Sequence, residues 1–164
     1  MIRSIRHLAV FITLLACSFT VPLRSNGQSA DLSDSTPMGN IGAGSSIMIN
    51  VDVILPANEG EIYFQNGTFT TWLEIDRKAP SCRLYTIGSP TVRKLVPGRK
   101  LIVTGTRFNN GGPNMYGDVL LFEDDATINQ LQCNAGRKGY MTIGELRKVF
   151  GGLFSLLQAE PVVG

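Results

Sequence analysis

The stretch "IMINVDVIL", residues 47–55, decides the fold class of this chain of 164 residues. Apolar side chains stand at positions 49, 51, 53 and 55, and the polar residues Asn50 and Asp52 stand between the first three of them. A period of two is typical of a β-strand that turns one face to a core and the other to water. We therefore expect a half-buried strand here, which needs partner strands elsewhere in the chain.

Six further segments read as short strands between turns rich in Gly, Pro and Asn, namely residues 62–64, 68–76, 82–87, 100–108, 118–123 and 128–133. Asn66-Gly67 is a strong hairpin signal, because both residues tolerate the positive φ angles that a two-residue turn requires. Seven short strands with such turns favour antiparallel pairing. We predict a mainly β fold, a single antiparallel β-barrel or β-sandwich domain.

The chain changes character near its end, where residues 142–157 predict a C-terminal α-helix. Thr142 and Glu145 have the spacing of a capping box. Apolar residues then recur at helical spacing and form one stripe: Ile143, Leu146, Val149, Phe150, Leu153 and Leu157. The stripe is expected to pack on the domain's own sheet. In the alternative reading it docks a partner, whose backbone would approach closely at Gly151-Gly152.

The N-terminus has the pattern of an export signal. Arg3, Arg6 and His7 precede a short apolar run over residues 8–16. As a helix this run would cover roughly 14 Å, about half of a bilayer's hydrocarbon core. We therefore expect residues 1–16 to be a signal peptide that is removed, with residues 27–30 as a weaker second cleavage site.

Leu14-Leu15-Ala16-Cys17 resembles the lipobox of bacterial lipoproteins, with an aliphatic residue three before the cysteine and a small residue just before it. The resemblance implies that Cys17 becomes the mature N-terminus and carries covalent lipid. Several acyl chains give stable membrane anchoring. Ser18, where the family's inner-membrane retention signal has Asp, implies the outer membrane with the domain in the periplasm.

Residues 17–45 are expected to form the lipidated N-terminus and a flexible linker, since Ser, Gly, Pro, Asn and Asp dominate them. The β-rich domain is expected to cover residues 46–164. Its arrangement is reminiscent of uncharacterised proteobacterial envelope lipoproteins, a likeness that transfers no site.

With Cys17 assigned to lipid, the other two of the three cysteines form an even pair. In an oxidising periplasm Cys82 and Cys133 should form one disulfide. Closing a loop of that length contributes roughly 4 kcal/mol on the chain-entropy model. A metal site is disfavoured, because two isolated thiolates lack companion ligands at zinc-site spacing.

Composition disfavours several function classes. The one histidine, His7, lies in the expected signal peptide, so the mature chain would lack histidine-dependent catalysis and histidine metal ligands. Removing Arg3 and Arg6 from the 15 basic residues leaves 13 against 13 acidic ones. A nucleic-acid partner then has no electrostatic basis. A local basic stretch remains, which reads as an ordinary solvated strand face or, in the alternative, as a contact for an anionic surface: Arg93, Lys94, Arg99, Lys100 and Arg107.

No catalytic or metal-binding motif is recognisable, and no cofactor is expected beyond the lipid on Cys17. We expect a non-enzymatic interaction or structural role in the cell envelope, with an envelope protein as partner. The alternative is a ligand- or glycan-binding module or an enzyme inhibitor, with residues 109–117 as the best loop candidate and deletion of residues 110–114 as its test. An enzyme would need carboxylates that converge around Glu74, Asp76 or Asp118. The acidic turn at Glu123, Asp124 and Asp125 reads as solvated rather than as a calcium site.

The sequence also singles out five aromatic residues that could contribute to binding, without separating them from core packing: Tyr63, Trp72, Tyr85, Tyr116 and Tyr140. It does not specify the oligomeric state.

Overall fold

The computed structural model describes residues 32–87, 91–110, 116–123, 127–136 and 139–159. The expected signal peptide, Cys17 and most of the expected linker lie outside the described residues. Within them the fold is mainly β, with one α-helix and one disulfide, as the sequence predicts. No helix in these ranges is long and apolar enough to cross a membrane.

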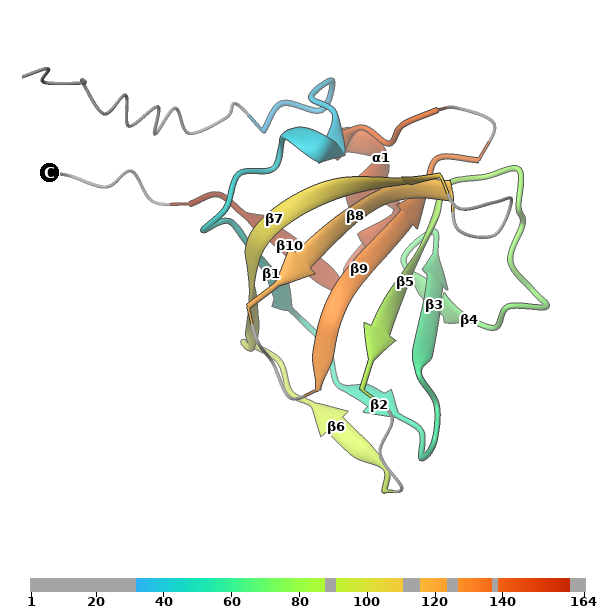
Figure 1. Ribbon diagram of the computed structural model, residues 1–164. Helices are drawn as coiled ribbons and strands as arrows, with labels where there is room; N and C mark the ends of the chain where they lie inside the picture. The colour runs from blue at the N-terminus through green and yellow to red at the C-terminus, as the bar shows by residue number, and fades with distance from the viewer. Residues whose placement is uncertain (1–31, 88–90, 111–115, 124–126, 137–138, 160–164) are drawn as a thin grey trace, which may run out of the picture.

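Eight strands form one curled antiparallel sheet, a half-barrel, in the order β10-β1-β7-β8-β9-β5-β3-β4 (Figure 1). The strands of this sheet are β1 (Ser46–Ile49), β3 (Glu61–Gln65), β4 (Thr68–Thr70), β5 (Ser81–Thr86), β7 (Lys100–Asn110), β8 (Tyr116–Phe122), β9 (Ile128–Asn134) and β10 (Phe154–Leu157). Every pairing between neighbours is antiparallel. The fold class is therefore confirmed.

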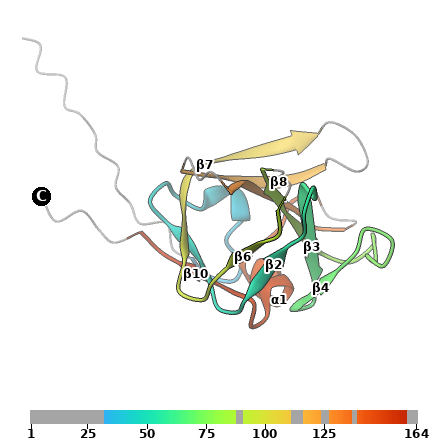
Figure 2. The same ribbon diagram turned by 90° about the horizontal axis from the view of Figure 1, so that it is seen from below.

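The single strand expected over residues 47–55 is two strands with one register. β1 pairs with β7, and β2 (Val53–Leu55) pairs with β6 (Arg93–Leu95) in a second, two-stranded sheet. Ser46 faces Ile102, and Val53, seven residues later, faces Leu95, seven residues earlier in the other strand. The pairing register is therefore the same on both sides of the interruption. The β2–β6 ribbon bends beneath the half-barrel (Figure 2). The predicted alternation holds in both strands, because Ile49, Val53 and Leu55 are buried.

The Asn66-Gly67 hairpin is confirmed, since both residues have positive φ, 52° and 75°, between β3 and β4. The strand predicted to run to residue 76 is wrong beyond Thr70. The Glu74 carboxylate accepts hydrogen bonds from the Thr71 amide and hydroxyl, at 3.2 and 2.9 Å, and closes a local turn. Such bonds compete with a strand ladder. Leu73, expected on a shared strand face, is 90% exposed.

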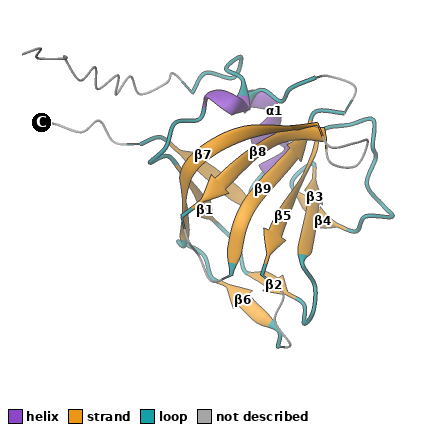
Figure 3. Cartoon of the chain, in the orientation of Figure 1, coloured by secondary structure: helices purple, strands orange, loops and turns teal. Residues whose placement is uncertain are grey.

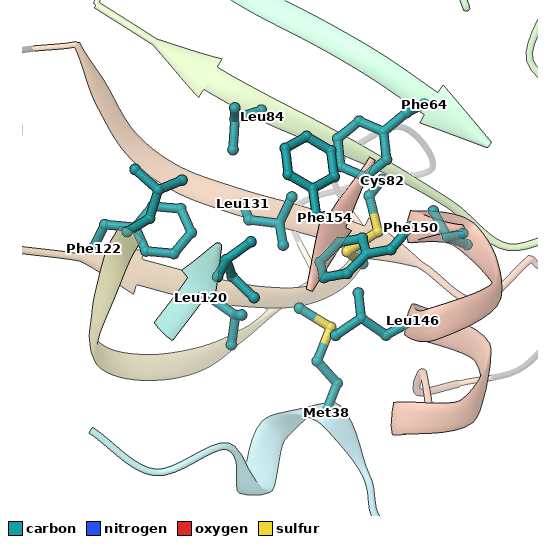
Figure 4. Packing of buried hydrophobic residues seen from close by; sticks show 14 of the residues in the cluster. Met38, Phe64, Cys82, Leu84, Leu120, Phe122, Leu131, Leu146, Phe150 and Phe154 are labelled. Atoms are coloured by element: carbon teal, nitrogen blue, oxygen red, sulfur yellow. A yellow bond between two sulfur atoms is a disulfide. The ribbon is translucent and has the colours of Figure 1, made fainter. Parts of the chain in front are cut away.

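The concave face of the half-barrel holds the core (Figure 4). Phe64 from β3, Phe150 from α1 (Ile143–Phe150) and Phe154 from β10 form a ring cluster with centroid separations of 5.0 to 6.0 Å. The ring centroid of Phe69 on β4 lies 6.4 Å from that of Phe154, so one side chain from each edge strand of the sheet joins the cluster. The Cys82–Cys133 disulfide joins directly paired residues of β5 and β9.

The predicted capping box of α1, the labelled helix in Figure 3, is present. Its apolar stripe is buried at Ile143, Leu146, Val149 and Phe150. The helix packs on its own domain. The predicted extension to residue 157 is wrong, because the helix ends at Phe150 and β10 follows. Gly151 packs against the backbone of Gly67, so the close approach that the glycines permit is intramolecular.

The linker predicted to run to residue 45 is also wrong in its last part. A 3-10 turn, η1 (Met38–Asn40), places Met38 and Ile41 in the core, 0 and 2% exposed. The Met38 amide donates to the Met141 carbonyl at 2.8 Å, and Thr106 donates to the Gly39 carbonyl at 2.8 Å. Two buried apolar side chains and these bonds hold a segment of polar composition against the domain.

Candidate functional site

The convex face of the sheet carries a row of polar side chains that strand register assembles. Tyr63 on β3 pairs with Arg83 on β5, and Arg83 pairs with Gln132 on β9. Because side chains alternate along strands, these three residues face away from the core, opposite to Phe64, Leu84 and Leu131. The row crosses three strands and forms the floor of the candidate site.

Arg83 is fixed within this row. Its guanidinium is 3.2 Å from Glu61 and donates to the Gln132 side-chain oxygen at 2.9 Å. The same oxygen accepts the Tyr85 hydroxyl at 3.1 Å, and the Arg83 guanidinium lies 4.6 Å from the Tyr85 ring centroid. The Arg83 side chain is 13% exposed and Gln132 is buried. A charged group held by this many partners is part of the framework of the site.

Tyr63 and Tyr85 are neutral hydrogen-bond donors at neutral pH. Burial raises the pKa of Tyr63, and the adjacent Glu61, whose carboxylate accepts the Tyr63 hydroxyl, raises it further. Burial likewise raises the pKa of Tyr85. Neither phenol is therefore suited to act as a base.

The connection between β4 and β5, residues 71–80, folds over the floor and forms a wall. Gln65 holds it: its amide nitrogen donates to the Asp76 and Pro80 carbonyls at 3.0 and 3.1 Å, and its oxygen accepts the Asp76 amide at 3.1 Å. Gly136, with φ of 68°, packs against the Lys78 backbone where a Cβ would overlap the carbonyl. The wall is anchored at both of these points.

Between wall and floor lies a pocket of about 270 Å³, which we call the outer-face pocket. Its aromatic side is Tyr63 and Trp72, with ring centroids 5.7 Å apart at 47°. The Arg77 guanidinium lies 4.4 Å above the Trp72 ring. The full lining is Tyr63, Trp72, Ile75, Arg77, Ser81, Cys82, Arg83, Gln132, Asn134 and Gly136, with two arginines and no carboxylate.

A second, more open groove of about 560 Å³ adjoins the pocket and shares Tyr63 and Trp72 with it. It runs between β2 and the β3–β4 hairpin, and its lining includes three carboxylates, of which Asp52 pairs with Lys94 and Glu61 with Arg83, whereas Glu59 has no ion pair among the described residues. The two aromatic rings thus stand between a basic pocket and a groove that contains carboxylates. This arrangement favours binding of a small polar ligand with one flat apolar face.

The structure does not gather the five predicted basic residues into one contact surface. Lys94 on β6 forms an ion pair with Asp52 at 2.7 Å, and Arg93 donates to the Ile87 carbonyl. Lys100 begins β7, whereas Arg107 lies seven residues further along and donates to Gln130 at 2.9 Å. Seven strand residues span about 23 Å. Arg99 lies in the turn before β7.

The three carboxylates named for an enzyme bind separate parts of the chain. Glu74 caps Thr71, Asp76 accepts the Lys78 amide at 2.9 Å, and buried Asp118 accepts the Met141 amide at 2.7 Å. Burial raises the pKa of Asp118. Across the described ranges no three His, Cys, Asp or Glu side chains cluster as a metal site would require.

Some of the other predicted positions lie outside the described residues. Asn110 ends β7, and the remainder of the loop at 110–114 lies outside the described residues, as do Asp124 and Asp125. Tyr140 is 58% exposed. Of the four aromatic candidates whose side chains the structure describes, Tyr63, Trp72, Tyr85 and Tyr140, the first two line the outer-face pocket. Arg77 and Arg83 were not singled out in the sequence. Glu61 and Tyr63, and likewise Arg83 and Tyr85, lie two residues apart and so share one face of their strand; this period of two is the sequence signal of a polar outer face.

Comparisons with known proteins returned no matching family model, no similar curated protein and no similar solved structure. The candidate site therefore stands on its own geometry.

Proposed function

We propose that this chain is an outer-membrane lipoprotein, anchored through Cys17, with a non-enzymatic interaction role in the bacterial cell envelope, and that it acts as a binding module. The lipobox resemblance and the short apolar segment before Cys17 support the proposed location in the outer membrane. The outer-face pocket supports the binding role. It is the observation that carries the proposal, because aromatic and cationic groups converge there on a rigid floor.

The anchoring half of the proposal is tested with a Cys17→Ala variant. Cells that express the full chain are labelled with an alkyne fatty acid and fractionated. The natural chain should carry label and sediment with the outer membrane, whereas the variant should carry none. Acylation retained in the variant would refute the lipobox assignment.

The binding half is tested in the same cells with a photo-crosslinking amino acid in place of Leu73, next to Trp72 on the wall. Leu73 is 90% exposed, so the substitution leaves the core intact. We expect one discrete adduct with an envelope component. An adduct pattern no different from that of uniformly exposed positions would count against the site.

A second candidate is a surface for a protein partner on the β2–β6 ribbon. Ile54, Val92 and Val96 are 56, 63 and 54% exposed and share the outward face of the ribbon, around the Lys94–Asp52 ion pair. Contiguous exposed apolar groups mark interaction sites. A crosslinker at Val96 tests this surface beside the one at Leu73: an adduct from Val96 alone would move the proposed interaction from the pocket to the ribbon.

A further inference from the structure

We propose that the outer-face pocket binds a sugar ring that carries a carboxylate, with the acid on Arg77 and a face of the ring against Tyr63 and Trp72. This inference rests on the proposed binding role of the pocket and names its ligand class. Acidic sugars of this kind occur in the glycan strands of the cell wall and in lipopolysaccharide, so the experiment distinguishes the two sources.

The charge of the pocket selects an anion. Two guanidinium groups line it and no carboxylate does. The charge of Arg83 is balanced by Glu61 at 3.2 Å. Arg77, in contrast, forms no ion pair with any residue in the described ranges; its recorded contact is the face of Trp72. An anionic ligand would supply the missing counter-charge.

The position of Arg77 favours a carboxylate. The Arg77 Cζ lies 4.4 Å from the centroid of the Trp72 ring, and a guanidinium presents a planar fork of N–H donors. Two parallel N–H groups match the two oxygens of a carboxylate. Arg77 can therefore bind a carboxylate in bidentate fashion, and its place beside Trp72 would put the acid next to the aromatic side of the pocket.

The rest of the lining suits a sugar ring. The faces of a pyranose carry C–H bonds that pack against aromatic rings, whereas its edge carries hydroxyl groups. Tyr63 and Trp72 provide the aromatic side, and Ser81 and Asn134 provide hydroxyl and amide groups on the floor. At about 270 Å³ the pocket is just below the usual range for drug-sized ligands, which fits one ring or two rather than a long oligosaccharide.

The site is largely ordered before a ligand arrives. Gln65 and Gly136 fix the wall, and Glu61 holds the hydroxyl of Tyr63. A preformed site pays less ordering entropy on binding. Small acidic sugars should therefore bind in isolation, without the polymer from which they derive.

Trp72 is the one tryptophan of the chain, so its fluorescence reports on this pocket. The full mature chain in detergent is titrated with N-acetylmuramic acid, which has a lactyl carboxylate, and with its neutral counterpart N-acetylglucosamine. The eight-carbon acidic sugar of lipopolysaccharide and inorganic phosphate are titrated in parallel. Calorimetry supplies an affinity that does not depend on the fluorophore.

We expect an acidic sugar to change Trp72 emission and to bind at least tenfold more tightly than the neutral one. Preference for N-acetylmuramic acid would assign the ligand to the cell wall, and preference for the eight-carbon acid would assign it to lipopolysaccharide. Equal affinity for acidic and neutral sugars, or binding of phosphate alone, would overturn the inference.

Arg77→Ala should lower the affinity at least tenfold, and Lys78→Ala is the matched control, because it removes an equal charge from the neighbouring exposed residue. Equal losses in the two variants would show general electrostatics and would overturn the role of Arg77. Thermal unfolding confirms that both variants fold. If no sugar binds while the Leu73 crosslink persists in cells, the ligand class is wrong and the proposed binding role stands.

Discussion

Reduction of the Cys82–Cys133 disulfide should remove a large share of the stability of this domain. The two cysteines are 51 residues apart and pair directly across β5 and β9. Both are buried, so the bond must be reduced in denaturant and the chain refolded with the reductant present. All samples carry Cys17→Ser, so that no third thiol takes part.

The size of the effect follows from loop closure. The chain-entropy model gives about 14 cal/mol/K for a loop of this length, or about 4 kcal/mol at 25 °C. Natural domains of this size have about 5–15 kcal/mol in total. Subtracting about 4 kcal/mol leaves about 1–11 kcal/mol, so the reduced protein is expected to stay folded at 25 °C with a markedly lower free energy of unfolding.

Urea unfolding measures the loss, with far-UV circular dichroism for the sheet and Trp72 fluorescence for the outer face. At about 1–3 kcal/mol per molar urea, the midpoint should fall by roughly 1.5–4 M. The reduced Cys17→Ser chain keeps the sulfur atoms of Cys82 and Cys133, so its loss of stability reports the cross-link alone. The Cys82→Ala/Cys133→Ala variant adds a small loss of packing. A loss of less than about 1 kcal/mol in the free energy of unfolding would refute the loop-closure reasoning.

Three further outcomes are expected. Gln65→Glu replaces the donor that binds the Asp76 and Pro80 carbonyls with an acceptor; it should cost about 1–3 kcal/mol and shift Trp72 emission to the red, and unchanged emission would contradict the anchoring of the wall. Gly117→Ala should cost about 2–4 kcal/mol in thermal unfolding, because φ is 148° and a Cβ would overlap the Cys133 carbonyl, while Gly105→Ala, where a Cβ meets open space, is the control. For Asp118, burial raises the pKa above its ordinary value of 3.8, so the native state holds the proton more tightly than the unfolded chain. The stability of the natural chain relative to Asp118→Asn should therefore be greatest below pH 3.8 and should decline as pH rises through the folded pKa. A stability difference that does not vary with pH would contradict the burial of this carboxyl group.

Much of the fold follows from local signals. Alternation at residues 47–55 and the Asn66-Gly67 turn depend on side-chain direction and backbone freedom, which are properties of the residues themselves. The capping box at Thr142 and Glu145 is equally local. These features were predicted correctly, and with them the mainly β class and the helix that packs on the sheet.

The errors arise where a distant segment decides the structure. Leu153 and Leu157 continue a helical stripe, yet the free edge of β1 offers a ladder of hydrogen bonds to the same residues, and β10 forms instead. Met38 and Ile41 are too sparse to mark structure in a polar stretch. They become core residues because Met141 and Thr106 bind the backbone beside them.

The outer-face pocket could not be predicted for the same reason, in a stronger form. Its floor joins Tyr63, Arg83 and Gln132, which are separated by 20 and 49 positions and meet through the registers of β3, β5 and β9. A slip of one residue in either pairing would turn one of these side chains into the core. The Cys82–Cys133 bond lies one position from Arg83 and Gln132 in the same two strands and fixes that register. The disulfide that the sequence predicts thus aligns Arg83 with Gln132, and the β3–β5 pairing adds Tyr63 to a floor that the sequence does not reveal.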